Sequence, residues 1–447
     1  RELPLAVAMP DQLDQVEQIL SLCDAQGVPV IARGAGTGLS GGATPRRDAL
    51  LLSMARFSRI IDVDPVGRTA RVEPGVRNLA ISEAAAPYGL YYAPDPSSQI
   101  ACTIGGNVAE NSGGVHCLKY GLTVHNILRL DVVLIDGEKI TVGSEALDSP
   151  GYDLLALMTG SEGMLGVVTA ITVRLLPIPV SAKTLLAGFD DVEKAADSVA
   201  KLIAAGVIPA GLEMMDNPAI QAAEDFSEAG YPRDAAAILI CEVDGTKAEV
   251  DRQIELTRSV FEIEGATEIQ VSASEQERQR FWSGRKNAFP AVGRISPDYY
   301  CIDGTIPRQQ LGRVLAGITE LSSTYGLRVA NVFHAGDGNL HPLILYDGAQ
   351  PGEFERTEAL GGKILELCIE VGGTITGEHG VGLEKIDQMC VQFKPRELEH
   401  FHGVKAAFDP RGLLNPGKAV PTLARCAEFN AMHVHDGRIP FPEIDRF

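Results

Sequence analysis

The pattern of hydrophobic positions in the first part of the chain predicts strands that alternate with helices. Apolar residues recur at helical spacing after Asp11, the expected cap, and this pattern ends at Gly27. A second helix is predicted over 76–88. Apolar runs predict strands over 3–9, 28–32, 49–54, 68–73 and 127–135, and a long β-branched strand within 159–177. A turn at 136–137 returns the chain into a strand over 140–142.

Beyond a boundary at Pro177 and Pro179, helical and extended patterns alternate again. Helices are predicted over 192–205, 249–264, 311–325 and 354–371, and strands over 238–243 and 328–333. Such an alternation predicts an α+β domain, with an antiparallel sheet covered by helices on one side. In the tail, His433 and His435 alternate as on a strand.

Length and composition limit the class of protein. A chain of 447 residues exceeds one ordinary core, so two domains are expected. A net charge of −20 argues against nucleic acid and anionic membrane surfaces as general partners, and an anionic substrate would need a local basic pocket. No stretch reaches the ~18 apolar residues of a membrane span. The eight cysteines contain no CxxC pair. This spacing predicts no disulfide framework and no iron–sulfur or zinc-ribbon site, and it favours a reducing cytosol.

The stretch 94–121 is unusually rich in glycine and short polar side chains. Five glycines lie between serines and asparagines, so the backbone can approach a ligand without an intervening Cβ. Its N–H groups and polar side chains can bind phosphate, ribityl or ring heteroatoms. A plain solvated loop is the alternative, but Ile100, Ile104 and Val108 are too apolar for one. The pattern favours a cofactor cradle.

A second glycine-rich loop, RGAGTGLSGG, spans 33–42 and contains GxGxxG. The dinucleotide interpretation requires a helix directly after the glycines. Here a strand is predicted instead, so NAD is the second choice of cofactor. Backbone N–H groups of this loop could still bind a pyrophosphate, with Arg33 as a nearby charge.

Four motifs, RGAGTGLSGG, PDPSSQ, IGGNVAENSGG and GSEGMLGVVT, together resemble the flavin-binding domain of the vanillyl-alcohol oxidase family over residues 1–177. The resemblance implies FAD extended between two α+β subdomains. Some members tether FAD through a histidine in the first loop; Thr37 stands here, which implies non-covalent FAD, with His116 as the remaining candidate tether. The family fold usually begins with a further helical segment, so this chain is expected to start after it. The implied FAD contacts are Arg33, Gly34, Ala35, Gly36, Thr37, Gly38, Leu39, Ser40, Pro96, Ser97, Ser98, Gly105, Gly106, Asn107, Ala109, Asn111, Gly113, Gly114, Gly121, Glu162, Gly163, Gly166, Val168 and Asn415.

Two further motifs, HAGDGNLH (334–341) and GEHG (377–380), each follow a predicted strand and contain a glycine turn. Two histidines and a carboxylate are the ligand set of an open catalytic metal site, although hydrogen-bonded structural histidines fit the spacing equally well. The motifs resemble the C-terminal domain of FAD-linked oxidases that act on 2-hydroxy acids. That resemblance implies His334, His341 and Glu378 as ligands of a divalent metal such as zinc or manganese, and His379 as the base.

A basic stretch offers a partner for a substrate carboxylate. Arg285, Lys286 and Arg294 lie close together in sequence, and Arg285 occupies the position where relatives bind a carboxylate; a solvated charged face is the alternative. Relatives that act on a long dicarboxylate carry a lysine near the position of Tyr300–Cys301 and an asparagine at the position of Leu343. Their replacement here favours a short substrate.

The resemblance therefore predicts four segments: an FAD-binding domain at 1–177, a substrate domain at 178–407, a return segment at 408–425 and a tail at 426–447 that could contact another subunit. The implied activity is FAD-dependent oxidation of glycolate to glyoxylate. Oxidation of D-lactate or D-2-hydroxyglutarate on the same scaffold is the enzymatic alternative, and a flavin-binding assembly subunit is the non-enzymatic one. Electrons would pass to a second FAD-domain subunit, an iron–sulfur subunit and then quinone. The expected location is cytoplasmic, at the inner face of the cell membrane where partner subunits attach it.

Overall fold

The computed structural model describes residues 2–146 and 151–429, and they form two compact units. The first unit contains the chain up to Gly113, Gly121–Ile178 and the chain from Glu378 on. The second contains Gly114–Tyr120 and Pro179–Gly377. Both combine helices with largely antiparallel sheets, which confirms the expected α+β class. The four segment bounds expected from the sequence stay a prediction.

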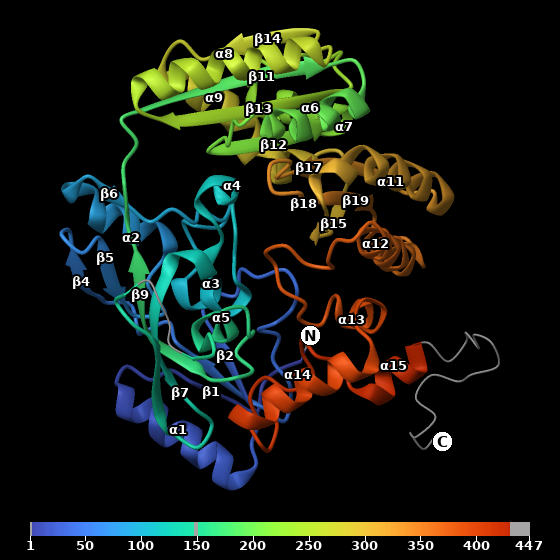
Figure 1. Cartoon of the computed structure of the whole chain (residues 1–447). Coiled ribbons are helices and arrows are strands. Elements are labelled where there is room, and N and C mark those ends of the chain that lie inside the picture. The colour runs from blue at the N-terminus through green and yellow to red at the C-terminus, as the bar shows by residue number, and fades with distance from the viewer. Residues whose placement is uncertain (1, 147–150, 430–447) are drawn as a thin grey trace. The chain divides into compact units, whose positions relative to one another are not determined.

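A small parallel sheet carries the first glycine loop. Its strand order is β1-β3-β2, and the loop connects β2 to β3, so the strand–loop–strand arrangement is confirmed. Helix α1 buries Val16, Leu20 and Cys23 (Figure 1). The expected cap at Asp11 is wrong: Gln12 occupies that position, and Gln15 accepts the Asp11 N–H instead. The bounds are β1 (Ala6–Ala8), α1 (Leu13–Gln26), β2 (Val30–Arg33) and β3 (Leu50–Ser53).

A five-stranded antiparallel sheet, ordered β4-β5-β9-β7-β8, forms the rest of the first unit's scaffold. Its buried face packs on α2 and α3 through residues such as Ile81 and Ile104. Strand β4 was not predicted, because it is mostly exposed and lacks a buried alternation. The bounds are β4 (Ile60–Asp64), β5 (Thr69–Val72), α2 (Asn78–Ala85), η1 (Ala86–Tyr88), β6 (Leu90–Tyr91), α3 (Ile104–Glu110), η2 (Thr123–Asn126), β7 (Ile127–Val133), β8 (Lys139–Gly143), α5 (Leu154–Met158), β9 (Val167–Arg174) and β10 (Leu176–Pro177).

The C-terminal segment returns to the small parallel sheet. Leu414 bridges Val30 in parallel, and Asn415 N–H donates to the Val30 carbonyl at 2.8 Å. Cys390 and Cys426 form a disulfide between α13 and α15. The prediction of no disulfide is therefore wrong, and the cysteine argument for a reducing compartment falls with it; spacing could not reveal a pair that helix packing creates. The bounds are α13 (Ile386–Gln392), α14 (Pro395–Phe408) and α15 (Leu423–Phe429).

The second unit is built on a seven-stranded antiparallel sheet, ordered β14-β11-β13-β12-β17-β19-β15. Alternate residues of its strands face opposite layers. Ile238 and Ile240 pack toward α7, α9 and α10, whereas Phe189 contacts Phe261 of α8 on the other face. Helices thus cover both faces, not one as expected. The strand bounds are β11 (Ser181–Phe189), β12 (Gly211–Asp216), β13 (Ala237–Gly245), β14 (Glu268–Val271), β15 (Asp298–Cys301), β16 (Gly304–Thr305), β17 (Arg328–Phe333), β18 (Asn339–Leu340) and β19 (Pro342–Tyr346).

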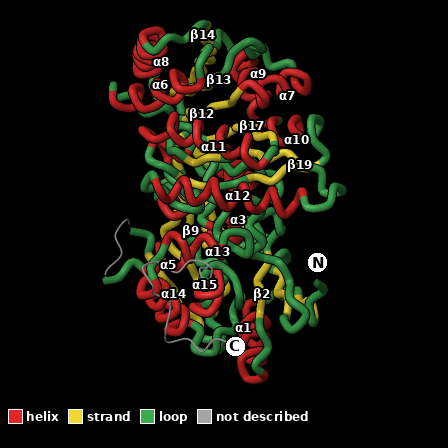
Figure 2. Tube along the Cα trace, turned by 90° about the vertical axis from the view of Figure 1, so that its right-hand side faces the viewer, coloured by secondary structure: helices red, strands yellow, loops and turns green. Residues whose placement is uncertain are grey.

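The helices of the second unit largely match the predicted periodic segments. Figure 2 shows α11 and α12 running side by side. The bounds are α6 (Val192–Ala204), α7 (Asn217–Ser227), α8 (Lys247–Ile263), α9 (Glu275–Lys286), α10 (Ala288–Val292), η3 (Arg308–Gln310), α11 (Leu311–Tyr325) and α12 (Glu353–Glu370). In the part of the chain that the structure describes, no helix combines the length and apolar character needed to cross a bilayer.

A short segment of the glycine cradle belongs to the second unit. Residues 114–120, with α4 (Cys117–Tyr120), are fastened to β13. Lys119 pairs with the Asp244 carboxylate, and the Tyr120 hydroxyl donates to the same carboxylate at 2.7 Å. The unit therefore includes residues from the middle of the predicted FAD domain.

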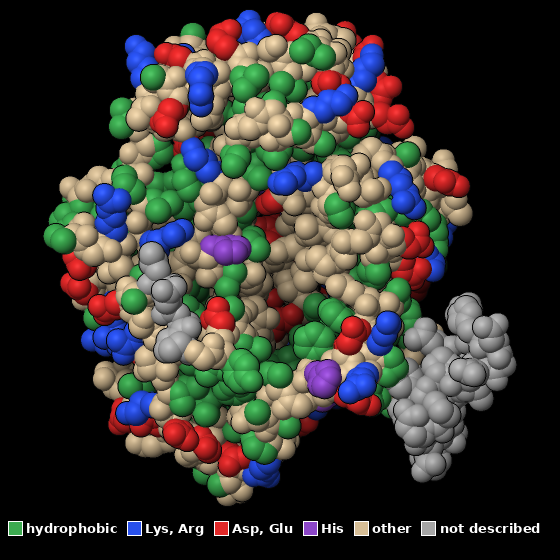
Figure 3. All heavy atoms as spheres, viewed as in Figure 1, with side chains coloured by type: hydrophobic (Ala, Val, Ile, Leu, Met, Phe, Trp, Pro, Cys, Tyr) green, Lys and Arg blue, Asp and Glu red, His purple; other side chains and the backbone are tan. Residues whose placement is uncertain are grey.

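Charged side chains of both signs are interspersed over the face of the molecule shown in Figure 3. On this face, acidic and basic side chains are therefore not separated into a single acidic and a single basic region.

A buried carboxyl at the end of β12 makes the stability of the second unit depend on pH. Burial raises the pKa of Asp216 from 3.8 to about 6, although Asn331 and the Ala219 N–H donate to it. Because the pKa of Asp216 is higher in the folded than in the unfolded state, its carboxyl stabilises the fold most at low pH. This contribution is lost as the pH rises from about 4 to above 6.

We expect Asp216→Asn to unfold at a higher temperature than the wild type at pH 7.5, and this gain should shrink toward pH 4.5. At about 1.4 kcal/mol per pKa unit, the difference amounts to about 3 kcal/mol at most. The Asn331 amide can flip to offer its oxygen, which has no partner among the described residues. Calorimetry across this pH range checks the prediction, and a difference between the two proteins that does not change with pH contradicts it.

Candidate functional site

The first glycine loop presents unused backbone N–H groups to solvent. Residues 35–39 are exposed, and among the described residues the N–H groups of 34–39 make no hydrogen bond. Gly36 has a φ of +73°, a conformation that favours glycine. A run of free N–H groups of this kind can bind the oxygens of a pyrophosphate.

Two buried hydroxyls beside this loop lack a hydrogen-bond partner among the described residues. They are Ser40 Oγ and Thr103 Oγ1, on residues 1% and 7% exposed. A Cβ on Gly34 would lie 2.2 Å from Thr103 Oγ1, so only glycine permits this approach. Buried polar groups are normally satisfied, and these two, with the free N–H groups of the loop, fit the phosphate and ribityl oxygens of FAD.

The cradle predicted over 94–121 is not a plain loop, because it contains helix α3. Within it, the side chains of Asn107 and Asn111 hold the chain itself. Asn107 donates to Asn78 at 2.8 Å, Asn78 donates to the Pro94 carbonyl at 2.9 Å, and Asn111 accepts the Val124 N–H at 2.9 Å. The remaining residues expected to contact FAD lie in the turn before α3, on α3 and at its end: Pro96, Ser97, Ser98, Gly105, Gly106, Ala109 and Gly113.

Four of the expected FAD residues, Gly121, Gly163, Gly166 and Val168, lie in the first unit at positions with evident backbone or packing constraints. Gly166 lies against β7, where a Cβ would come 2.3 Å from Val132. Gly163 has a φ of +70° in the turn before β9, and Val168 pairs with Val132 in the sheet. Gly121 has a φ of +81°, and Gly114 belongs to the second unit. Contact of these residues with FAD stays a prediction.

Glu162 anchors the turn at 380–382. Its carboxylate, 5% exposed, accepts the N–H groups of Val381 at 2.7 Å and Gly382 at 2.8 Å. Burial raises the pKa of Glu162 despite these bonds. Its carbonyl accepts the Asn415 amide at 2.7 Å, so the predicted return segment and the turn meet at this residue.

Lys418 extends this network. Its ammonium group donates to the carbonyls of Gly42 and Thr44, both at 2.9 Å, and to Asn415 Oδ1 at 3.0 Å. Burial lowers the pKa of Lys418 to about 8. The lysine thus fixes the end of the first glycine loop, a role the sequence alone did not predict.

In the second unit, the turn after β17 brings the two histidines of HAGDGNLH together, as expected. The ring centroids of His334 and His341 are 5.1 Å apart, and the rings are nearly perpendicular. Both residues are at most 4% exposed. Gly338 closes the turn with a φ of +82°, in a place where a Cβ would lie 2.2 Å from the Ile306 carbonyl oxygen.

A buried glutamate that the sequence analysis missed lies between His334 and Arg285. Glu213 Oε1 is 2.8 Å from His334 Nδ1, and Glu213 Oε2 accepts from Arg285 Nε at 2.7 Å. Burial alone would raise the pKa of Glu213, but His334 and Arg285 together lower it. The available signal was a lone glutamate inside GLEMMD, the otherwise apolar strand β12.

Of the three basic residues of the stretch 285–294, only Arg285 is buried. It is 3% exposed, and its N–H donates to the Tyr231 hydroxyl at 2.9 Å. Burial raises the pKa of Tyr231, which keeps that hydroxyl neutral. Lys286 is exposed, and Arg294 lies over the Phe226 ring on the surface.

Glu378, His379 and Gly380 of the GEHG motif belong to the first unit, whereas Gly377 belongs to the second. The strand expected before it is wrong, because only Thr374 forms an isolated bridge, with Thr305. Nε2 of His379 lies 3.8 Å from the Glu378 carboxylate. Since His334 and His341 belong to the second unit, the joining of Glu378 with them at a metal stays a prediction. Of the tail predicted at 426–447, residues 430–447, with His433 and His435, lie outside the described residues.

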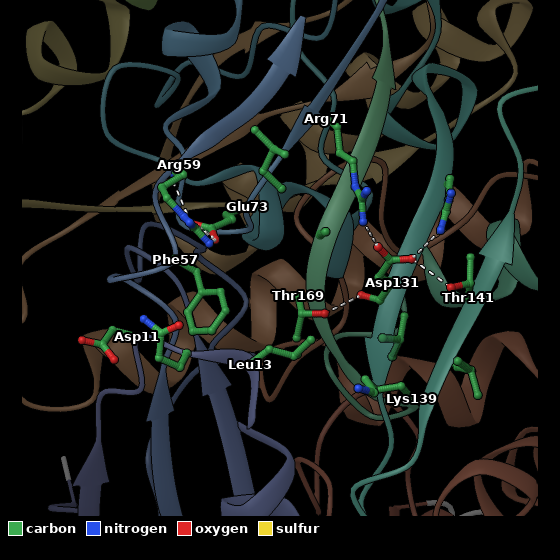
Figure 4. Close-up of a pocket in the computed structure, with 16 residues that line it drawn as sticks. Asp11, Leu13, Phe57, Arg59, Arg71, Glu73, Asp131, Lys139, Thr141 and Thr169 are labelled. Carbon is green, nitrogen blue, oxygen red and sulfur yellow. Dashed lines mark hydrogen bonds and ion pairs between the residues drawn. The ribbon is translucent and has the colours of Figure 1, made fainter. Parts of the chain in front are cut away.

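A groove of about 500 Å³ runs along the outer face of the five-stranded sheet (Figure 4). Its charged residues pair with one another: Arg59 with Glu73 at 2.7 Å, and Arg71 with Asp131 at 2.6 Å. None of the predicted FAD, metal or catalytic residues lines it. We assign no chemistry to this groove.

Comparisons with known proteins agree with the motif analysis. A family model described as an FAD binding domain matches residues 4–143, and one described as the C-terminal domain of FAD-linked oxidases matches residues 178–419. Glycolate oxidase subunit GlcD of Escherichia coli is 66% identical over 447 residues, covering 100% of this chain and 90% of that protein. A D-lactate dehydrogenase of Archaeoglobus fulgidus is 33% identical over 421 residues, covering 93% of this chain and 91% of that protein.

A solved structure of p-cresol methylhydroxylase with substrate bound superposes with a TM-score of 0.78 at 18% identity, covering 94% of this chain and 89% of that one. At this identity the likeness establishes the fold alone. The two family models and the 66% identity to the E. coli relative confirm the family resemblance that the motifs predicted.

Two substitutions of Glu162 should lower stability to different degrees. Glutamine keeps one acceptor oxygen, so Glu162→Gln should leave one N–H of the 381–382 turn unsatisfied and lower the free energy of unfolding by about 1–3 kcal/mol. Glu162→Ala should cost more. Thermal unfolding and flavin content measure the two effects, with Glu83→Gln on the exposed face of α2 as the control. Loss of flavin at an unchanged unfolding temperature would mean that the carboxylate binds the cofactor directly.

Proposed function

The chain belongs to the family of FAD-linked oxidases, and on that premise we propose that it oxidises glycolate to glyoxylate with FAD as the hydride acceptor. The observation that carries the proposal is the buried chain Arg285–Glu213–His334, which holds a carboxylate-binding cation next to a ring nitrogen donor. A 2-hydroxy acid carries the two groups, a carboxylate and a hydroxyl, that such a pair can bind. The name of the E. coli relative supports glycolate in particular.

FAD, when bound, supplies the flavin that accepts the hydride from the substrate Cα. The N–H groups of residues 34–39 would bind its pyrophosphate, and the hydroxyls of Ser40 and Thr103 would donate to its oxygens. Because Thr37 stands where a tethering histidine would be, the bond to FAD is non-covalent in this proposal.

Arg285 binds the substrate carboxylate. Only its Nε is engaged by Glu213, which leaves the terminal amino groups for a charge-assisted pair. The Tyr231 hydroxyl fixes the backbone of the same residue. The arginine therefore has a set position before substrate arrives, which lowers the entropic cost of orienting the acid.

His379 takes the hydroxyl proton, the role of a positioned general base. A divalent cation, held by His334, His341 and Glu378, would polarise the hydroxyl and lower its pKa. The donor set of two imidazoles and a carboxylate suits such an ion. His334 also fits, because a neutral ring whose Nδ1 donates to the Glu213 carboxylate would ligate through Nε2.

The substrate is short in this proposal. Cys301 and Leu343 are register partners on β15 and β19, and both are buried. Relatives that act on a long dicarboxylate carry polar residues at or near these two positions. Since neither side chain here is charged, no ion pair for a distal carboxylate is available from them.

Oxidation of D-lactate and a purely structural role are the two alternatives to glycolate oxidation. The D-lactate dehydrogenase relative is half as identical as the glycolate oxidase subunit, which makes D-lactate the second choice of substrate. A purely structural flavin-binding subunit has no need for a buried Arg285 paired through Glu213 to His334, so this chemistry argues against that role.

Partners belong to the same proposal. The E. coli relative is named as a subunit, which supports an assembly of several chains. We place a second FAD-domain subunit and an iron–sulfur subunit after the flavin, with quinone downstream. The location would be the cytoplasmic side of the membrane, reached through those partners.

A substrate panel tests the activity. Anaerobic flavin bleaching with glycolate, D-lactate, L-lactate and 2-hydroxyglutarate should give the highest kcat/KM for glycolate. A hundredfold preference for 2-hydroxyglutarate would contradict the short-substrate proposal. A flavin that none of the four acids bleaches would favour the assembly subunit.

His379→Ala should retain FAD and slow flavin reduction by roughly 10²–10⁴, the usual contribution of a positioned base. His400→Ala, on the exposed face of α14, is the matched control and should leave the rate unchanged. Stopped-flow absorbance measures both. A reduction rate within twofold of wild type would exclude His379 as the base.

A further inference from the structure

Glu213 divides its two carboxylate oxygens between two functional side chains from separate elements. Oε2 accepts from Arg285 on α9, and Oε1 lies against Nδ1 of His334 after β17. The residue is on β12, at the centre of the sheet, and is 0% exposed. Its two hydrogen bonds therefore have no competition from solvent.

The chemistry of the three groups determines where the imidazole proton lies. Arginine has five donors and no acceptor, so the oxygen that faces it must accept. An ionised carboxylate paired with arginine is likewise only an acceptor, so His334 must carry its proton on Nδ1. The lone pair of the neutral ring is then on Nε2.

We propose that Glu213 is a positioning residue that fixes the proton of His334 on Nδ1, so that Nε2 can bind a metal, and that holds Arg285 through the same carboxylate. This proposal rests on the proposed function, in which His334 is a metal ligand and Arg285 binds the substrate. It adds a direct coupling: the residue that orients the ligand also orients the substrate cation.

The coupling predicts an unusual effect of glutamine at position 213. The amide has one acceptor oxygen and one donor nitrogen, and Arg285 accepts nothing, so the oxygen must face Arg285. The amide NH₂ then faces Nδ1 of His334. To accept this bond, His334 must move its proton to Nε2, which blocks the nitrogen that would ligate.

The test measures the affinity of chelator-stripped, FAD-containing protein for Mn²⁺ by calorimetric titration. Glu213→Gln should bind Mn²⁺ about 10–100-fold more weakly than wild type, as expected when the partner of a ligating histidine is lost. Asp216→Asn is the matched control: it replaces another buried carboxyl of β12 that contacts neither histidine, and it should bind Mn²⁺ within threefold of wild type.

Removing Arg285 should reverse the defect. In Glu213→Gln with Arg285→Met, the amide oxygen is free to rotate toward His334, and Mn²⁺ affinity should return to within about threefold of wild type. Glu213→Leu with Arg285→Met offers no acceptor and should stay at least tenfold weaker than that double variant. Both double variants lack the buried charges, so this comparison holds even where Glu213→Gln alone fails to fold.

The outcomes separate this proposal from the proposed function. Wild-type Mn²⁺ affinity in folded Glu213→Gln, or equal affinities in the two double variants, would overturn the positioning role and leave the metal site standing. A wild-type protein that binds no Mn²⁺ would overturn both the metal site and the role of Glu213 toward His334. Glycolate bleaching of the flavin in that protein would still support the oxidase.

Discussion

The buried polar cluster of the second unit depends on one group, the Glu213 carboxylate, which pairs with both Arg285 and His334. Placing Glu213, Arg285 and His334 together in an interior at most 4% exposed carries a large desolvation cost. Hydrogen bonds of 2.7 and 2.8 Å on two different oxygens offset that cost only while all three groups are present. Because the glutamate projects from a central strand with neighbours on both sides, its position is set by the sheet rather than by a loop. Arg285 on α9 and His334 in the turn after β17 are thus held in position by the rigid strand β12.

The first unit uses the same principle with backbone donors. Glu162 accepts two N–H groups of the 381–382 turn, while its carbonyl and Lys418 hold the return segment against the first glycine loop. Within the described part of the chain, the N–H groups of residues 34–39 in the loop itself make no hydrogen bond. A ligand-binding loop is more effective when its supports are rigid and its own donors are unspent, since binding then requires little reorganisation. In this arrangement, Glu162 and Lys418 hold the loop in its conformation, whereas the backbone N–H groups of the loop can bind a ligand.

The sequence predicted what depends on local spacing. Long amphipathic helices such as α6 and α11, the strands on either side of the first glycine loop, and the turn that brings His334 to His341 were all expected. Features that depend on tertiary packing were not. Strand β4 has exposed side chains and so no alternation, Gln15 replaced Asp11 as the capping side chain, and the Cys390–Cys426 disulfide joins helices 36 residues apart. Glu213 was missed because a single glutamate in an apolar strand indicates burial but does not indicate which side chains it hydrogen-bonds.

The segment 114–120 has a consequence for how this fold can be divided. The polypeptide passes between the two units at 113–114, 120–121, 178–179 and 377–378, so no single cut yields an intact second unit. A fragment limited to 179–377 would lack Lys119 and Tyr120 and leave Asp244, 5% exposed, without these two hydrogen-bond donors. Recombination among relatives is therefore constrained. A chimaera that exchanges the second unit must also take residues 114–120 from inside the glycine-rich stretch 94–121, so the two segments can only be inherited together.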